Sequence, residues 1–294
     1  MAEKSYTDEN LLKKEEIMPE DERKSPSLGD RMKIHEQAAE RYLVRRVPLI
    51  IRLDGNCFHS WTHGLERPFD NNLRLCMEYA AYSVCKEISG ARFAYTQSDE
   101  ISILIVDYQD FNTEPWFNYR GNKVESVAAS MCTAGFNTAV LKYLPEHIKR
   151  KGFAFFDARA FNAPKEDVSN YFLWRQRDCE KNSVSSLAQA HFSHKELYGK
   201  NGSEMQDMLM LQKNINWNDV RTRYKRGTAL YKVQIVSPNP MDPAGPEVIR
   251  NKWVADYEMP IITQDRLYVE RWLAADPIPQ VMPGNYVTFE TIKI

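Results

Sequence analysis

Two acidic residues of this chain lie at the ends of apolar runs, where β-strands would begin or end. The run at 50–53 ends at Asp54, and Asp99 precedes the run at 101–106. A side chain at a strand end is held in place by the rigid sheet, which suits chemistry. If the two strands are neighbours, Asp54 and Asp99 meet. Two converging carboxylates are typical ligands of Mg²⁺, which completes its shell with substrate phosphate oxygens.

Two further carboxylates lie close to these positions in the sequence. Successive side chains of a strand point to opposite faces, so we expect only one of Asp99 and Glu100 to be a direct partner of Asp54. Asp157 follows the apolar run 153–156, which we expect to form another strand.

The elements around these residues predict an antiparallel sheet. An apolar helix is expected to begin near Pro68 and to stop at Gly90, and residues 92–106 read as a hairpin with Ser98 and Asp99 near its tip. A helix at 123–143 and the strand at 153–156 follow. Strand, helix, hairpin, helix, strand is the order of a ferredoxin-like α+β unit, with helices on one face of a mainly antiparallel sheet.

Three regions are predicted along the chain. Residues 1–27 are polar and form an N-terminal extension, and residues 28–236 form the main domain, which opens with a helix ending near Pro48. The second half of that domain is mainly helical, at 167–190 and 203–211, and ends in a strand at 229–236. Residues 237–294 are expected to be a linker and extension, because they open with the Pro-rich stretch 238–246.

Composition excludes several classes of protein. The net charge of -1 argues against a globally basic protein, so any nucleic acid must be held by a local patch. The segment 221–226, with four cations in six residues, is the first choice for such a contact with RNA. Its cations are Arg221, Arg223, Lys225 and Arg226. The five scattered cysteines favour reduced thiols, and neither a membrane span nor a signal peptide is evident, so a cytoplasmic protein without membrane attachment is expected.

Several ordered motifs resemble those of the tRNA-His guanylyltransferase superfamily, whose enzymes add nucleotides to RNA in the 3′-to-5′ direction. They extend from about Leu28 to Lys232, and their number and order make the resemblance specific. The motifs are Arg52-Leu53-Asp54-Gly55, Phe58-His59, Arg67-Pro68-x-Asp70, Tyr95-x-Gln97-Ser98-Asp99-Glu100, Phe156-Asp157-x-Arg159, Trp174-Arg175-Gln176-x-Asp178 and Tyr224-Lys225-Arg226-Gly227-Thr228.

The resemblance implies a polymerase-palm fold and roles for individual residues. Two Mg²⁺ ions are expected on Asp54, Asp99 and the backbone carbonyl of Gly55, with Glu100 as a further catalytic acid. The residues implied to bind the nucleotide are His59 and Asp70, near the base, and Arg67, Ser98 and Lys123, near the triphosphate; Arg175 and Gln176 are candidates for RNA contact. The family commonly has Lys where Arg67 stands, and arginine keeps the charge with a different geometry.

One departure separates two branches of the superfamily. Enzymes dedicated to tRNA-His carry a His-Ile-Asn-Asn-type segment where this chain has Glu180-Lys181-Asn182-Ser183. The sequence is similar instead to the Thg1-like proteins, for which template-directed repair of tRNA 5′ ends is implied, with ATP or GTP activating a 5′-monophosphate end. The implied partners are tRNA and NTPs, and the implied assembly is a homotetramer. Guanylate addition to tRNA-His is the alternative.

Two rival functions are compatible with the same residues. A palm-fold nucleotide cyclase shares the core and the paired aspartates, although it needs no RNA-binding second half. A catalytically silent RNA-binding protein is a different class, and it has no use for two strand-end carboxylates.

Overall fold

The computed structural model describes residues 25–238, 241, 247–274, 280–281 and 287–289, which fall into two units, 1–40 and 41–294. In the first unit, helix α1 (Leu28–Gln37) begins after Ser27, which forms a capping box with Asp30. It ends at Gln37 and not near Pro48, and it buries no residue, so no core contact extends it. Most of the expected extension, residues 1–24, lies outside the described residues.

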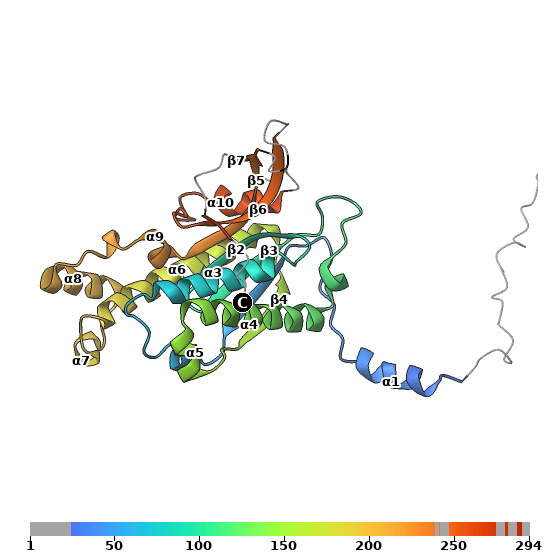
Figure 1. Ribbon diagram of the computed structural model, residues 1–294, viewed down its shortest axis with the longest axis horizontal. Helices are drawn as coiled ribbons and strands as arrows, with labels where there is room; N and C mark the ends of the chain where they lie inside the picture. The colour runs from blue at the N-terminus through green and yellow to red at the C-terminus, as the bar shows by residue number, and fades with distance from the viewer. Residues whose placement is uncertain (1–24, 239–240, 242–246, 275–279, 282–286, 290–294) are drawn as a thin grey trace, which may run out of the picture. The chain divides into compact units, whose positions relative to one another are not determined.

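The second unit is built on an antiparallel sheet (Figure 1). Its order is β4-β1-β3-β2-β5-β6-β8, and β7 pairs in parallel with β5. Order and direction confirm the predicted α+β class and the strand, helix, hairpin, helix, strand unit. The strands are β1 (Leu49–Gly55), β2 (Ala91–Gln97), β3 (Glu100–Ile105), β4 (Phe156–Asn162), β5 (Thr228–Ser237), β6 (Val248–Asp256), β7 (Gln280–Val281) and β8 (Val287–Thr288).

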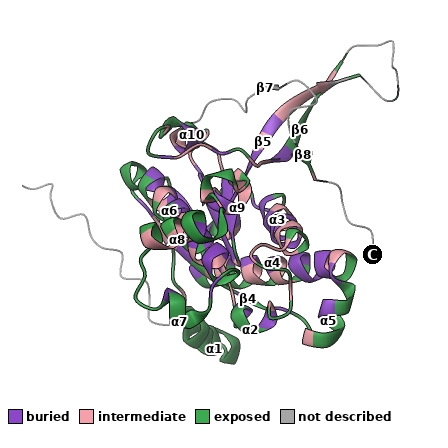
Figure 2. Cartoon of the chain, turned by 90° about the vertical axis from the view of Figure 1, so that its left-hand side faces the viewer, coloured by how far each residue is buried: buried purple, intermediate pink, exposed green. Residues whose placement is uncertain are grey.

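Helices cover both faces of this sheet. Alternate residues of β1 explain why: Leu49, Ile51 and Leu53 pack into the core under α3 and α4, whereas Ile50 packs into a second core under α6. Figure 2 shows the buried sheet between these layers. The long helices are α3 (Asn71–Cys85), α4 (Gly121–Tyr143), α6 (Lys165–Gln189) and α8 (Gly202–Lys213); the shorter ones are α2 (Phe58–Trp61), α5 (Pro145–Lys151), α7 (His194–Leu197), α9 (Thr222–Arg226) and α10 (Leu267–Glu270), with 3₁₀ turns η2 (Trp116–Tyr119), η3 (Trp217–Asp219) and η4 (Arg271–Leu273).

Two strands differ from expectation. The apolar run at 153–156 is not a strand: Phe153 and Phe155 are 60% and 62% exposed, and β4 begins only at Phe156, so Asp157 lies near the start of a strand. The region expected as a C-terminal linker contributes β6, which pairs with β5 over its whole length and packs Val254 into the second core. None of the described helices is long and apolar enough to span a membrane.

Candidate active site

The predicted pair of carboxylates lies where β1 meets the β2–β3 hairpin. Strands β1 and β3 are neighbours, and the Gly55 N–H donates to the Asp99 carbonyl at 3.1 Å. Ser98, with a φ of 50°, closes the turn that carries Asp99. The charge of Asp54 acts on the Asp99 carboxyl. The structure therefore brings Asp54, Gly55 and Asp99 together, as the sequence predicts.

Gly55 is required here by packing. A Cβ atom at this position would lie 2.2 Å from the Phe58 ring. That ring is buried in an aromatic cluster with Trp61, Phe136 and Phe156, at centroid distances of 5.0 to 5.4 Å. The Phe58 ring can lie this close to the backbone only because residue 55 has no side chain.

Glu100 has a different environment from Asp99. It lies opposite Asp54 in the β1–β3 register, is 3% exposed, and pairs with Arg52 Nη2 and Arg175 Nε, each at 2.7 Å. The same Arg52 Nη2 lies 3.3 Å from Asp54 Oδ2. Glu100 is thus occupied by two arginines, and Asp99 is the carboxylate available beside Asp54. We expected strand alternation to leave only one of the adjacent acids as a partner of Asp54, but Asp99 lies in the turn before β3, and the charge of Asp54 acts on both acids.

Burial sets the electrostatics of both acids. It raises the pKa of Asp99, and the nearby charge of Asp54 raises that pKa further. Burial also raises the pKa of Glu100, although Arg175 and Arg52 oppose this shift. Arg52 pairs with Asp54, whereas Asp99 forms no ion pair with any residue that the structure describes, so its carboxylate beside Asp54 favours a bound cation.

A cavity of about 370 Å³ opens beside Asp99 and contains most of the predicted nucleotide residues. We call it the His59 cavity. Asp70 has a structural role here as well: it caps α3 by accepting from the Leu73 N–H at 2.9 Å and accepts from the Glu66 N–H at 3.0 Å. The lining residues are Phe58, His59, Thr62, Leu65, Glu66, Arg67, Pro68, Asp70, Leu73, Ser98, Asp99, Ser186 and Gln189.

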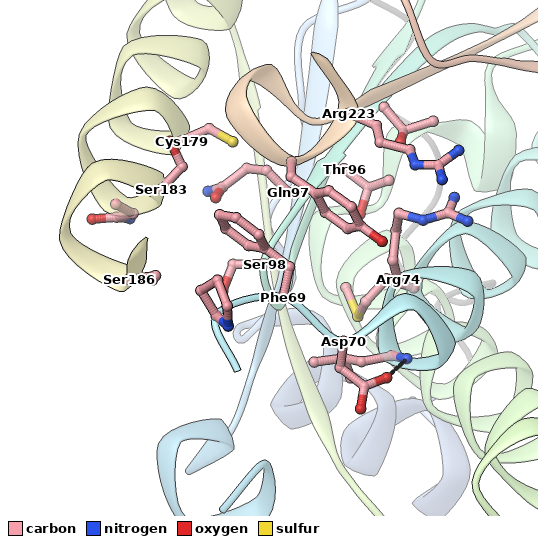
Figure 3. A pocket seen from close by; sticks show the side chains of 16 residues that line it. Phe69, Asp70, Arg74, Thr96, Gln97, Ser98, Cys179, Ser183, Ser186 and Arg223 are labelled. Carbon is pink, nitrogen blue, oxygen red and sulfur yellow. Dashed lines mark hydrogen bonds between the residues drawn. The ribbon is translucent and has the colours of Figure 1, made fainter. Parts of the chain in front are cut away.

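A smaller cavity of about 180 Å³ adjoins it (Figure 3). We call it the Gln97 cavity. The two cavities share Pro68, Asp70, Leu73, Ser98 and Ser186. The sequence motifs include Gln97 and Ser183 but assign neither of them, nor Ser186, to a cavity, because these residues come from elements distant in the chain. The position of Gln97, directly before Ser98 and Asp99, was the available signal.

Three predicted residues lie elsewhere. Lys123 lines neither cavity, and its Nζ lies 4.7 Å from the centre of the Phe117 ring. Two hydrogen bonds show how helix α4 runs along β4. Thr133 bonds Phe156, which pairs with Gly55 of β1, and Glu125 bonds Ala160, which pairs with Ile51. Lys123 therefore lies toward the end of the sheet opposite Asp54.

Arg175 and Gln176 lie in the interior. Arg175, 4% exposed, binds Glu100 and also Asp178 at 2.8 Å. The Gln176 carboxamide donates to the Pro260 carbonyl at 2.8 Å and accepts from the Ile262 N–H at 2.9 Å. Both side chains are engaged in holding α6 to the sheet and to the segment after β6.

The basic segment 221–226 forms helix α9, and its cations point to different surroundings. Arg221 is exposed, and Arg223 lines the Gln97 cavity. Lys225 is buried and donates to the Asn218 carbonyl at 2.5 Å, while Arg226 pairs with Glu180 at 3.1 Å. Only part of the segment is thus available to a partner.

Comparison with known proteins adds to this geometry. Residues 29–164 match the model of a family described as tRNAHis guanylyltransferase, Thg1. A bacterial Thg1-like protein solved in complex with ATP is 43% identical, with a TM-score of 0.76, over 85% of this chain and 100% of that one. Its complex with GTP gives 40% identity and a TM-score of 0.70 over 84% and 99%. A probable tRNA(His) guanylyltransferase of Dictyostelium discoideum is 28% identical over 67% of this chain and 80% of the relative.

Proposed function

Since the chain belongs to the tRNAHis guanylyltransferase (Thg1) superfamily of nucleotidyltransferases, we propose that it repairs tRNA 5′ ends by template-directed 3′-to-5′ nucleotide addition. The observation that carries the proposal is that Asp99 lines the His59 cavity while the charge of Asp54, on the neighbouring strand β1, acts on its carboxyl group. The 43% identity to a bacterial Thg1-like protein supports the repair branch.

The donor set fits Mg²⁺. Asp54, Asp99 and the Gly55 carbonyl offer hard oxygen atoms, and among the described residues no group of three His, Cys, Asp or Glu side chains offers a different metal site. Two carboxylates with substrate phosphates completing the shell are a common Mg²⁺ arrangement. When bound, two Mg²⁺ ions would supply charge stabilisation for the attacking and leaving oxygens.

The other residues bind and orient the substrates. In the His59 cavity, Arg67 and Ser98 would bind the triphosphate, and His59 and Asp70 would lie near the base. Glu100 would act as a positioning residue, because it holds Arg52 against Asp54 and is itself held by Arg175. Phosphoryl transfer depends chiefly on such positioning and on electrostatic stabilisation.

The reaction would run in two steps on a 5′-monophosphate end. An oxygen of the RNA 5′-phosphate attacks the α-phosphorus of ATP or GTP, pyrophosphate leaves, and a 5′-5′ linkage forms. The 3′-hydroxyl of the incoming NTP, paired with the opposite strand, then attacks the RNA 5′-phosphorus and expels the mononucleotide. An RNA with a 5′-triphosphate needs only the second step and releases pyrophosphate.

RNA and subunit contacts complete the proposal. Exposed Arg221 and the partly exposed Arg223 would contact the tRNA backbone. Lys123 lies away from the His59 cavity of its own chain, so it would reach a triphosphate only from a neighbouring subunit of the expected homotetramer. Arg175 and Gln176, buried and fully engaged, would support the site from within.

A second candidate is guanylate addition to tRNA-His. Relatives of 26–28% identity from Dictyostelium discoideum and Saccharomyces cerevisiae carry the name tRNA(His) guanylyltransferase, in the former case as probable. The Glu180–Ser183 segment favours repair instead.

An extension assay tests the proposal. Purified protein, Mg²⁺, ATP and all four NTPs would be combined with several tRNAs lacking one 5′ nucleotide, and with tRNA-His lacking its extra guanylate. We expect addition of the complementary nucleotide on several species and its loss in Asp54→Ala and Asp99→Ala. Extension of tRNA-His alone would favour the second candidate. Conversion of NTP to a cyclic product without RNA extension would identify a cyclase.

A further inference from the structure

The Gln97 cavity is a separate compartment next to the proposed nucleotide site. Its volume of about 180 Å³ is below the range of about 300–1,000 Å³ usual for pockets that bind whole small ligands. Its size suits a planar fragment and is too small for a complete nucleotide. It is formed by the start of α3, the end of β2, the middle of α6 and helix α9.

The carboxamide of Gln97 faces this space without a partner. The side chain is 7% exposed, and in the part of the chain that the structure describes no hydrogen bond to its amide is formed. Figure 3 places its end toward Cys179 and Ser183 of α6. An unpaired amide aimed into a cavity points to a ligand with both an acceptor and a donor.

An aromatic wall stands beside this amide. The rings of Phe69 and Tyr224 are stacked at 4.9 Å with an interplanar angle of 7°, and the Tyr224 hydroxyl donates to Asn71 Oδ1 at 3.2 Å, which fixes the pair. Flat aromatic faces of this kind bind nucleobases by stacking, largely irrespective of which base is bound.

The side chains of Cys179 and Ser183, toward which the Gln97 amide points in Figure 3, are uncharged. Burial raises the pKa of the Cys179 thiol to about 12, and the Ser183 hydroxyl is already engaged with the Glu180 carbonyl and the Trp217 indole. Three charged residues line other parts of the cavity: Asp70 caps α3, Arg74 pairs with Glu78, and Arg223 lies 5.2 Å from the centre of the Tyr257 ring. A neutral planar group suits this environment better than a phosphate.

We propose that the Gln97 cavity binds one nucleobase, stacked on Phe69 and hydrogen-bonded by the Gln97 carboxamide. Adenine suits this best, because its N6 amino group and N7 match the acceptor and donor of a carboxamide. The inference rests on the proposed function, since the shared residues Asp70 and Ser98 connect this cavity to the nucleotide site. The base comes either from a free nucleotide or from an unpaired residue of the RNA.

Binding measurements distinguish the two sources and need no turnover. ATP would be titrated calorimetrically in the absence of RNA, and a 3′-labelled tRNA would be followed by fluorescence anisotropy in the absence of nucleotide. In Gln97→Leu we expect about a tenfold loss of affinity for one of the two ligands. A loss for ATP assigns the cavity to the nucleotide, and a loss for tRNA assigns it to the RNA. Gln212→Leu, on the exposed face of α8, is the matched control.

Two further variants separate recognition from folding. Phe69→Leu keeps an apolar side chain at a partly exposed position and removes the stacking face. It should therefore lower the affinity for the same ligand that Gln97→Leu affects. Gln97→Glu should lower the affinity for an adenine-bearing ligand more than for a cytosine-bearing one. A carboxylate only accepts hydrogen bonds, so it cannot donate to adenine N7 but can accept from cytosine N4. Unchanged affinities for both ATP and tRNA in folded Gln97→Leu and Phe69→Leu would overturn the proposal. This result would count against base binding in the Gln97 cavity whether or not the protein extends tRNA. Failure of this proposal can therefore be told apart from failure of the proposed repair function.

Discussion

At the scale of single residues, Glu100 connects α6 to the proposed metal carboxylate. Its removal would leave the buried guanidinium group of Arg175 and the partly buried one of Arg52 without their shared anion. We expect Glu100→Gln to lower the free energy of unfolding by about 3 kcal/mol, because breaking a buried ion pair leaves uncompensated charge. Denaturant unfolding measures this difference.

Asp178 supplies the control for that change. It pairs with the same Arg175, but its side chain is 38% exposed. Asp178→Asn should therefore cost less than about 1 kcal/mol. Equal losses in the two variants would show that burial of the Glu100 pair is not what matters.

Such residues limit what a sequence reveals. Asp54 and Asp99 are predictable because a carboxylate at the end of an apolar run is a recognisable local sequence pattern. The burial of Arg175 has no such local pattern. An arginine on a helix is usually exposed, and its buried partner Glu100 is 75 positions away in the sequence. The same reasoning applies to Gln97, which looks like any other strand residue until α6 is placed above it.

At the scale of elements, His147 of α5 anchors α2, the element that follows Asp54. Its Nε2–H donates to the Trp61 carbonyl at 2.7 Å, and its Nδ1 accepts from Arg150 at 3.0 Å, so the ring is neutral. Burial lowers the pKa of His147, and the Arg150 charge lowers it further. Protonation would direct an N–H at a guanidinium.

Stability should therefore fall on acidification. Below the ordinary His pKa of about 6.5, the unfolded chain takes up a proton that the folded chain does not, so folding becomes less favourable as pH falls through this value. We expect His147→Gln to have a smaller loss of unfolding free energy between pH 7.5 and 5.5 than the parent. His63→Gln, at an exposed histidine, should keep the full loss; an unaltered pH profile in His147→Gln would contradict this account.

Helix α9 gives a second prediction at this scale. Arg221→Gln should weaken tRNA binding severalfold and reduce the salt dependence, as the slope of log affinity against log salt concentration, by about 1. Lys225→Gln should instead lower the melting temperature, because Nζ donates to the Asn218 carbonyl and lies over the Trp217 ring. Binding titrations at several salt concentrations and a melting curve for each variant measure these effects. Loss of tRNA affinity in Lys225→Gln with loss of stability in Arg221→Gln would refute the assignment.

At the scale of the whole molecule, the described segment 248–273 contributes a strand and buried side chains to the folded core. The sequence does not predict β6, because its first five residues are partly or fully exposed and only its later part is apolar and buried. Alternation is therefore weak, and the pairing with β5 becomes evident only once the sheet is assembled. The palm-like unit was predictable because each of its elements has its own periodicity and its own stop signal.

Two substitutions in one strand test this view. Val254 is fully buried in the second core and Ile249 is 59% exposed. Val254→Ala should lower the free energy of unfolding by about 2 kcal/mol, whereas Ile249→Ala should change it by less than about 0.5 kcal/mol. Chemical denaturation compares them, and equal stability of the two variants would mean that β6 is dispensable for the core.

The contact between residue 55 and the Phe58 ring has a genetic consequence. Gly55→Ala should abolish function through a steric overlap, not through the loss of any chemical group. A smaller residue at position 58 removes that overlap, so Phe58→Leu should appear as an intragenic suppressor of Gly55→Ala, whereas Phe58→Tyr should not. A selection that depends on this activity would then recover compensating changes at position 58, and none should arise for Asp54→Ala.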